Sequence, residues 1–164
     1  MKKLSRDFFT RHSEIVAAEL LGKTLEANNK RAIIIETECY RGYDDPASHA
    51  YRGPTKRSQT MFEEPGRLYV YLIYGMHHCL NFITEPKGNP GAVLIRAIKD
   101  LDNNQIINGP GRVCKYLNIT REHNGADLLN SEFKLYDNQE TLTYQTSPRI
   151  GIKQGLEKLW RFTI

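Results

Sequence analysis

Short runs of β-forming residues, separated by turn signals, restrict the fold of this 164-residue sequence more than any other feature. Residues 68–74 and 77–84 are two such runs, and the glycine of Gly75-Met76 predicts a tight turn that joins them in a hairpin. The other runs that predict strands are residues 24–26, 31–40, 92–98 and 133–137. Residues 28–30, Asn-Asn-Lys, predict a second hairpin, between 24–26 and 31–40.

Two segments carry helix signals. In residues 13–21, Ser13 is placed to cap the first turn, and Gly22 follows as a stop signal. Residues 108–111, Asn-Gly-Pro-Gly, predict a turn that leads into a helix ending near Leu117. Many strands with few helices favour an α+β fold, in which a curled, largely antiparallel β-sheet has peripheral helices.

The length and charge of the chain limit its number of domains and its classes of partner. The chain falls within the roughly 100–200 residues of a typical domain, which predicts a single domain over residues 1–164. Its 23 Lys and Arg residues exceed the 19 Asp and Glu residues, which permits a polyanionic partner but is equally typical of an ordinary, slightly basic protein. No apolar run reaches the ~20 residues of a membrane span, and residues 1–10 lack the apolar core of a signal peptide. These features predict a cytoplasmic protein without a membrane partner.

Cysteines and histidines are the residues to test for a metal site. The cysteines are Cys39, Cys79 and Cys114. They are scattered without CxxC spacing, which predicts neither a disulfide framework nor a zinc module. His49, His77 and His78 are potential ligands, but their spacing with Cys79 matches no tetrahedral zinc pattern. The sequence therefore predicts no metal site.

Two carboxylates lie close together in the predicted strand 31–40. Because side chains alternate between the faces of a strand, Glu36, Glu38 and Tyr40 are expected on one face, with Ile35 and the other intervening residues on the opposite face. Two carboxylates beside an aromatic ring indicate a polar site. The same pattern also fits an exposed strand with solvated glutamates, and the strand alone does not decide between them.

Tyrosines are concentrated in residues 69–76. Tyr69 and Tyr71 are expected on the same strand face, and Tyr74 lies beside the glycine at the hairpin tip. Aromatic residues with this spacing commonly form core or cross-strand pairs. They would also suit a pocket that stacks on a nucleic-acid base, with the tip residue as a wedge between base steps.

Basic residues occur both in a strand and in a long loop. Arg96 interrupts the apolar run 92–98, so Glu36, Glu38 or a phosphate is expected beside it, unless the strand is a solvent-exposed edge. Residues 41–67 have no sustained periodicity, and a loop of this length is often functional. The loop carries Arg52, Lys56 and Arg57. These are either solvated charges or a phosphate clamp that acts with backbone N–H groups near Gly109 and Gly111.

Five motifs follow one another along the chain. They are Glu36-Thr37-Glu38-Cys39-Tyr40, Asp45-Pro46-Ala47-Ser48-His49, Tyr69-Val70-Tyr71-Leu72-Ile73-Tyr74-Gly75-Met76, Asn108-Gly109-Pro110-Gly111 and Pro148-Arg149-Ile150-Gly151-Ile152. In this order they resemble the alkyladenine (3-methyladenine) DNA glycosylase family, over nearly the whole chain from about Ala18. The resemblance implies a monomeric, monofunctional enzyme without metal or organic cofactor. Such an enzyme flips a damaged base out of double-stranded DNA and hydrolyses its glycosidic bond.

The resemblance also implies roles for individual residues. It makes Glu38 the general base that activates water, with Arg96 close to this carboxylate and to the DNA backbone. The implied pocket residues are Tyr40, His49, Tyr71, Asn81, Ile150 and Gly151, among which Asn81 screens out normal purines. Tyr74, with Met76 beside it, corresponds to the residue that enters the minor groove and fills the vacated stack. Cys39 departs from the alanine expected there, but it is predicted to point away from the site.

Two other functions fit parts of the sequence. A non-catalytic nucleic-acid-binding module would use the same basic loop and aromatic residues, but it gives Glu38 no role. A metal-dependent nuclease or hydrolase would be built on Glu36, Glu38 and the histidines. The three functions predict base release, binding alone, and chelator-sensitive strand cleavage, respectively.

Overall fold

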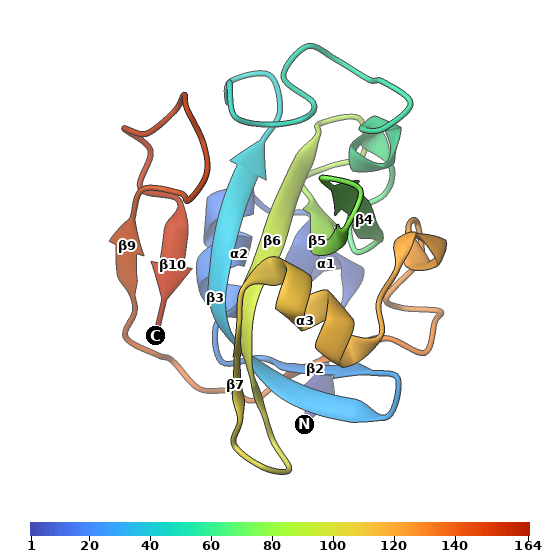
Figure 1. Cartoon of the computed structure of the whole chain (residues 1–164), viewed down its shortest axis with the longest axis vertical. Coiled ribbons are helices and arrows are strands. Elements are labelled where there is room, and N and C mark those ends of the chain that lie inside the picture. The colour runs from blue at the N-terminus through green and yellow to red at the C-terminus, as the bar shows by residue number, and fades with distance from the viewer.

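The computed structural model describes all 164 residues and has a ten-stranded, antiparallel sheet at its centre (Figure 1). The strands are β1 (Lys2–Lys3), β2 (Thr24–Ala27), β3 (Lys30–Arg41), β4 (Leu68–Ile73), β5 (His77–Thr84), β6 (Gly91–Asp100), β7 (Ile106–Asn108), β8 (Lys134–Asp137), β9 (Gln145–Ser147) and β10 (Arg161–Thr163). Their order is β1-β8-β2-β3-β6-β5-β4, with β7 beside β6 and with β10 between β3 and β9. The sheet curls without closing, so the predicted α+β class is confirmed.

Three α-helices pack against this sheet. In the view of Figure 1, α1 (Arg6–Phe9) and α2 (Ser13–Leu20) lie behind it, and α3 (Pro110–Leu117) lies in front. Core residues from the helices include Phe9, Val16, Leu20, Val113 and Leu117. Burial of apolar side chains of this size stabilises a fold by about 1.5–3 kcal/mol each. None of the helices is long and apolar enough to cross a membrane.

The long loop predicted from the sequence is present between β3 and β4. Its only regular element is a single 3-10 turn, η1 (Gln59–Phe62). Ala50 and Met61 of the loop are buried with Tyr69, Ile83 and Ala92 of the sheet in a second, small core. This packing holds the loop over one face of the sheet, which is the face that carries the candidate site.

The two central strands, β3 and β6, pair irregularly at one point. Their register shifts on both sides of Glu36. Ile34 before this point and Cys39 after it both belong to the main core. They are an odd number of positions apart, so the alternation of side chains between the two faces is shifted by one residue near Glu36. The prediction that Ile35 shares the core face with Cys39 is therefore wrong, because a regular strand was assumed. Cys39 does point into the core, as expected.

Both hairpin turns lie where the asparagine and glycine residues predicted them. Asn28 and Asn29 both have positive φ, 49° and 63°, in the two-residue turn between β2 and β3. The β4–β5 turn contains Tyr74, Gly75 and Met76, because Ile73 pairs with His77. Tyr74 therefore belongs to the turn, and its assignment to the strand was wrong.

Several short elements were not predicted from the sequence, and the N-cap of α2 was predicted at the wrong residue. The N-cap of α2 is His12 and not Ser13. The Ser13 hydroxyl donates a hydrogen bond to the buried carboxylate of Glu85 instead. Gly22 ends α2 with a φ of 81°, as expected from its lack of a side chain. The missed elements are β1, β7, β9, β10 and α1. Elements of two to four residues are too short to show periodicity in a sequence.

Candidate active site

Four neighbouring strands bring together side chains from distant parts of the chain. Glu38 of β3 lies opposite Leu94 of β6, which lies opposite Asn81 of β5. Asn81 in turn lies opposite Tyr69 of β4. Residues paired across strands point to the same face of a sheet. This row places a carboxylate, an amide and a phenol on one face, under the long loop.

Glu38 lies at the centre of a hydrogen-bond network. Its side chain is fully buried, and Oε1 accepts hydrogen bonds from the Tyr40 hydroxyl at 2.9 Å and from Arg96 Nη1 at 3.3 Å. Oε2 accepts a hydrogen bond from the backbone N–H of Ile150 at 2.7 Å. An ionised carboxylate has about four acceptor positions, so these three donors leave one of them unused. The network rules out a solvated surface glutamate.

Arg96 links the two glutamates of β3. Its Nε donates to Glu36 Oε1 at 3.2 Å, and Glu36 also accepts a hydrogen bond from Arg161 Nε of β10 at 2.7 Å. β6 lies inside the sheet between β3 and β5, so Arg96 is not on an exposed edge. The expectation that a glutamate pairs with Arg96 is confirmed, and both glutamates do so.

The surroundings of Glu38 affect its ionisation in opposite directions. Burial is the largest influence and raises the pKa of Glu38 above its usual value, and the negative charge of Glu36 adds to the rise. Arg96, the Ile150 N–H and the Tyr40 hydroxyl lower the pKa and limit this increase. These three donors therefore favour the ionised form, which is the form that can accept a proton.

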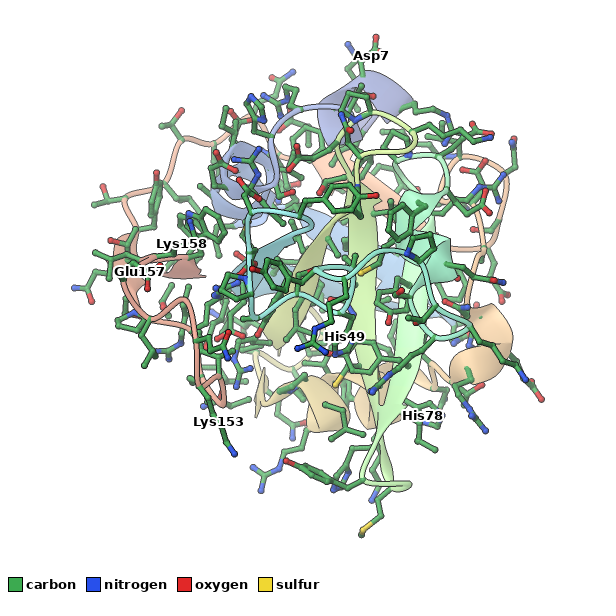
Figure 2. The ribbon with its side chains drawn as sticks, turned by 90° about the horizontal axis from the view of Figure 1, so that it is seen from above. Asp7, His49, His78, Lys153, Glu157 and Lys158 are labelled. Carbon is green, nitrogen blue, oxygen red and sulfur yellow. The ribbon has the colours of Figure 1, made fainter.

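A cavity of about 250 Å³ opens beside this network. Its lining residues are Tyr40, Ala47, His49, Met61, Tyr69, Tyr71, Ile73, Tyr74, Cys79, Asn81, Ala92, Leu94, Arg96, Pro110, Ile150, Gly151 and Ile152. Residues 148–160, between β9 and β10, form the C-terminal loop. Seen from above, His49 lies near the centre of the molecule, between Lys153 of this loop and His78 of β5 (Figure 2). The cavity is mostly apolar and aromatic, with a few polar groups, as expected for a small-molecule site.

Aromatic rings form the wall nearest the long loop. The His49 and Tyr71 rings meet edge to face with centroids 4.6 Å apart, and Tyr69 lies 5.2 Å from Tyr71. His49 Nδ1 is 3.0 Å from the Tyr69 hydroxyl. This bond fixes the orientation of the imidazole although His49 as a residue is exposed. The rings present flat faces and edges that suit a planar ligand.

The ionisation of the aromatic wall is also perturbed. Burial and the nearby positive charge of Arg57 lower the pKa of His49 to about 4, so the imidazole is neutral at neutral pH. Burial raises the pKa of Tyr69 to about 12 and keeps Tyr71 protonated. The Arg57 guanidinium lies 5.0 Å from the Tyr71 ring centre. The aromatic wall therefore carries no charge of its own at neutral pH.

A larger and more open groove of about 760 Å³ lies elsewhere, between α2, residues 137–144 and β10. Its walls carry Glu14, Glu19 and Glu140, but the groove does not contact the Glu38–Arg96 network. We assign the site to the smaller cavity, because three of its lining residues bind the buried carboxylate of Glu38.

Comparison with known proteins identifies the class of this site. The family model described as "Methylpurine-DNA glycosylase (MPG)" matches residues 7–164, which is almost the whole chain. The chain belongs to the methylpurine-DNA glycosylase family. It is thus assigned to the DNA glycosylases, and the resemblance of the five motifs is confirmed.

Relatives of this glycosylase match it over nearly their full length. A protein of Rickettsia rickettsii (strain Sheila Smith), described as "Putative 3-methyladenine DNA glycosylase", is 52% identical over 163 residues, which cover 98% of this chain and 89% of that protein. A protein with the same description from Wolbachia sp. subsp. Brugia malayi (strain TRS) is 52% identical and is covered to 96%. A third, from Ehrlichia chaffeensis (strain ATCC CRL-10679 / Arkansas), is 50% identical and is covered to 92%.

Most site residues expected from the sequence lie together in the glycosylase. The residues that line the cavity are Tyr40, His49, Tyr71, Tyr74, Asn81, Arg96, Ile150 and Gly151, and Glu38 lies directly behind it. Asn81 Nδ2 donates to the Tyr69 carbonyl oxygen at 3.2 Å, which fixes the orientation of the amide. Arg52 and Lys56 are exposed on the long loop and do not line the cavity.

The β4–β5 turn projects from the protein beside the cavity. Tyr74 is 90% exposed and Met76 is 73% exposed, so neither is a core residue. Tyr74 also has a φ of 54°, a left-handed conformation that is unusual for a bulky residue. A strained, exposed tyrosine is poorly explained by stability alone, and strain of this kind is often found at functional sites.

One backbone hydrogen bond and close packing constrain the two glycines of the turn before α3. The Gly109 N–H donates to the Arg96 carbonyl oxygen at 2.8 Å, so it is not free to bind a phosphate. Gly109 has a φ of 112°, which favours glycine for conformational reasons. At Gly111 a Cβ would lie 3.1 Å from that of His77, so close packing against β5 explains this glycine.

Several residues of the cavity were not among the site residues expected from the sequence. These are Ala47, Met61, Tyr69, Ile73, Cys79, Ala92, Leu94, Pro110 and Ile152. Most are apolar and resemble core residues in a single sequence, so no local signal distinguishes them. Tyr69 was recognisable only as part of the tyrosine pattern. No group of three His, Cys, Asp or Glu side chains in the chain has an arrangement that could hold a metal ion.

Proposed function

We propose that the protein is a monofunctional, monomeric DNA glycosylase that removes alkylated purines from double-stranded DNA. The observation that supports this most is the buried Glu38 carboxylate, which is bound by three residues of an aromatic cavity. The damaged base, 3-methyladenine or 7-methylguanine, is flipped into the cavity. Glu38 then activates a water molecule that attacks the sugar at C1′.

The chemistry of an alkylated purine fits this cavity. Alkylation at a ring nitrogen gives the base a positive charge, which weakens the glycosidic bond and improves the leaving group. Electron-rich faces of Tyr40 and Tyr71 attract such a cation by roughly 0.5–2 kcal/mol per contact. Because His49 is neutral above its pKa of about 4, it does not repel the cation. The ionised Glu38 stabilises the positive charge that develops on the sugar, and general-base catalysis contributes ~10²–10⁴-fold.

One experiment separates this function from its two alternatives. Methylated duplex DNA is incubated with the protein, with and without a chelator, and free base, abasic sites and strand breaks are measured. We expect free base and abasic sites at equal rates in both conditions. Binding without base release would indicate a non-catalytic module. Strand cleavage that the chelator abolishes would indicate a metal-dependent nuclease.

The first prediction concerns the reaction product. No lysine lines the cavity, so no amine is placed to form a Schiff base with the sugar. The abasic strand should therefore remain intact and should break only after treatment with alkali or heat. The measurement is gel electrophoresis before and after alkali. Trapping of a covalent protein–DNA adduct by borohydride would contradict a purely hydrolytic reaction.

The second prediction concerns Tyr74 at the β4–β5 tip. Tyr74→Ala should leave the melting temperature nearly unchanged, because the side chain is 90% exposed. Binding to lesion-containing duplex should weaken by roughly 1–3 kcal/mol, the value of base–aromatic stacking. Tyr144→Ala removes another exposed tyrosine away from the cavity and should not change binding. A large drop in melting temperature with unchanged lesion binding would make Tyr74 a packing residue instead of a wedge.

A further inference from the structure

A buried ion pair lies directly behind the cavity. Arg149 and Asp45 are both fully buried, and their contacts are parallel, with Nη1 2.6 Å from Oδ2 and Nη2 2.8 Å from Oδ1. Two parallel charge-assisted hydrogen bonds give a rigid geometry. Neither residue lines the cavity or binds Glu38, so the proposed reaction assigns them no role.

Each partner of this pair holds a different wall of the cavity. Asp45 accepts hydrogen bonds from the N–H of Arg41 at 3.0 Å and of Ala47 at 3.2 Å, which fixes the start of the long loop. Arg149 donates to the carbonyl oxygen of Cys39 in β3 at 2.9 Å. The pair therefore ties the C-terminal loop to both β3 and the loop that carries His49.

The guanidinium of Arg149 also lies close to two aromatic rings. It lies 4.8 Å from the Tyr40 ring centre and 5.2 Å from that of Trp160. Nη2 approaches the Gly155 carbonyl oxygen at 3.5 Å, at the far end of the C-terminal loop. A Cβ at Gly155 would lie 2.8 Å from this Nη2, so the loop closes tightly around the guanidinium.

The residue after Arg149 is the one that binds the carboxylate. Ile150 donates its backbone N–H to Glu38 Oε2, yet its side chain is 48% exposed and does not anchor this segment in the core. The neighbouring buried group is Arg149. We infer that the Asp45–Arg149 pair is a positioning device that places the Ile150 N–H against Glu38. This inference rests on the proposed function, in which Glu38 is the general base.

The positioning has a consequence for the pH dependence of base release. A hydrogen bond from the Ile150 N–H stabilises the ionised carboxylate and so lowers the pKa of Glu38. If the N–H moves away, this pKa rises, and more of the enzyme is protonated and inactive at a given acidic pH. The acid limb of the rate profile then moves to higher pH. If the ion pair were purely structural, its loss would lower the stability of the fold without moving that limb.

The test uses Arg149→Lys, which keeps the positive charge but cannot make two parallel bonds to a carboxylate. Single-turnover base release from methylated duplex DNA is measured against pH. We expect the acid limb to move up by about one pH unit, because a charge-assisted hydrogen bond is equivalent to about one to two pKa units. The affinity for the duplex should change less than twofold. Asp127→Asn is the matched control, since it removes an ion pair with Arg6 away from the cavity and should leave the limb in place.

Gly155→Ala is the second variant, in case Arg149→Lys does not fold. It removes no polar group, but its Cβ would displace the guanidinium and should move the limb in the same direction. The carboxyl ¹³C resonance of Glu38, titrated in the free protein, reports the same pKa change without catalysis. An unchanged Glu38 titration in a folded variant would overturn the inference. Failure of the wild-type protein to release any base would overturn the proposed function instead, and the titration would still test the pair.

Discussion

Glu38→Gln should reduce single-turnover base release from methylated DNA by ~10² or more, as expected when a general base is removed. Glutamine keeps the shape of the side chain and can still accept hydrogen bonds from Tyr40 and Ile150. It cannot accept a proton or carry the negative charge that stabilises the sugar. Affinity for DNA should hold or rise, because a negative charge near a polyanion has been removed.

Glu36→Gln is the matched control for this substitution. Glu36 binds Arg96 and Arg161 but does not line the cavity, so its loss should affect stability more than chemistry. The measurement is the rate of base release with enzyme in excess over DNA. A Glu38→Gln enzyme with a nearly normal rate would show that the general base is wrongly assigned, and Glu36 would then be the first alternative to test.

Arg96→Met should destabilise the fold strongly at neutral pH, by about 3–5 kcal/mol, because it leaves two buried carboxylates without their shared cation. Activity should also fall, since loss of the positive charge raises the pKa of Glu38 further. Arg161→Met is the control: Arg161 is more exposed, and Arg96 still pairs with Glu36 in its absence. Its effect should be about 1 kcal/mol or less.

The pH dependence of the Arg96→Met effect has a definite sign. A carboxyl whose pKa is higher in the folded than in the unfolded state binds more protons when folded, so stability falls as pH rises through that interval. The deficit relative to wild type should therefore be smallest near pH 4.5, the ordinary pKa of a glutamate, and should grow toward neutral pH. The measurement is urea unfolding at several pH values. A deficit that shrinks as pH rises would contradict the proposed burial of both charges.

The sequence predicts the larger parts of the fold because they carry local signals. Alternating β-forming residues locate every major strand, and the asparagine and glycine turns locate the two hairpins. The order of the strands has no such signal, since it depends on long-range packing. Neither the pairing of β10 with β3 nor the irregular register at Glu36 is visible in the chain. The predicted face of Ile35 was wrong for this reason.

In the candidate site, too, residues with a local chemical signal could be predicted, and residues placed only by tertiary packing could not. Residue chemistry indicated Glu38, Arg96 and the tyrosines, because carboxylates and cations in apolar strands need partners. Cys79 and Leu94 face the cavity only because their strands are adjacent, and they have the composition of ordinary core residues. Arg149 and Asp45 each lie within one of the five motifs, but they are distant in sequence, so their pairing was not visible. The network around Glu38 is thus a property of the tertiary structure.

The most direct test of the account is the structure of the Glu38→Gln protein bound to a duplex that contains one alkylated purine. We predict that the damaged base lies outside the helix, in the cavity between Tyr71, His49 and Tyr40. Tyr74 should occupy the vacated position in the stack, and the sugar C1′ should lie close enough to residue 38 for one bridging water. A complex in which the damaged base remains stacked in the duplex, with the cavity empty, would contradict the account.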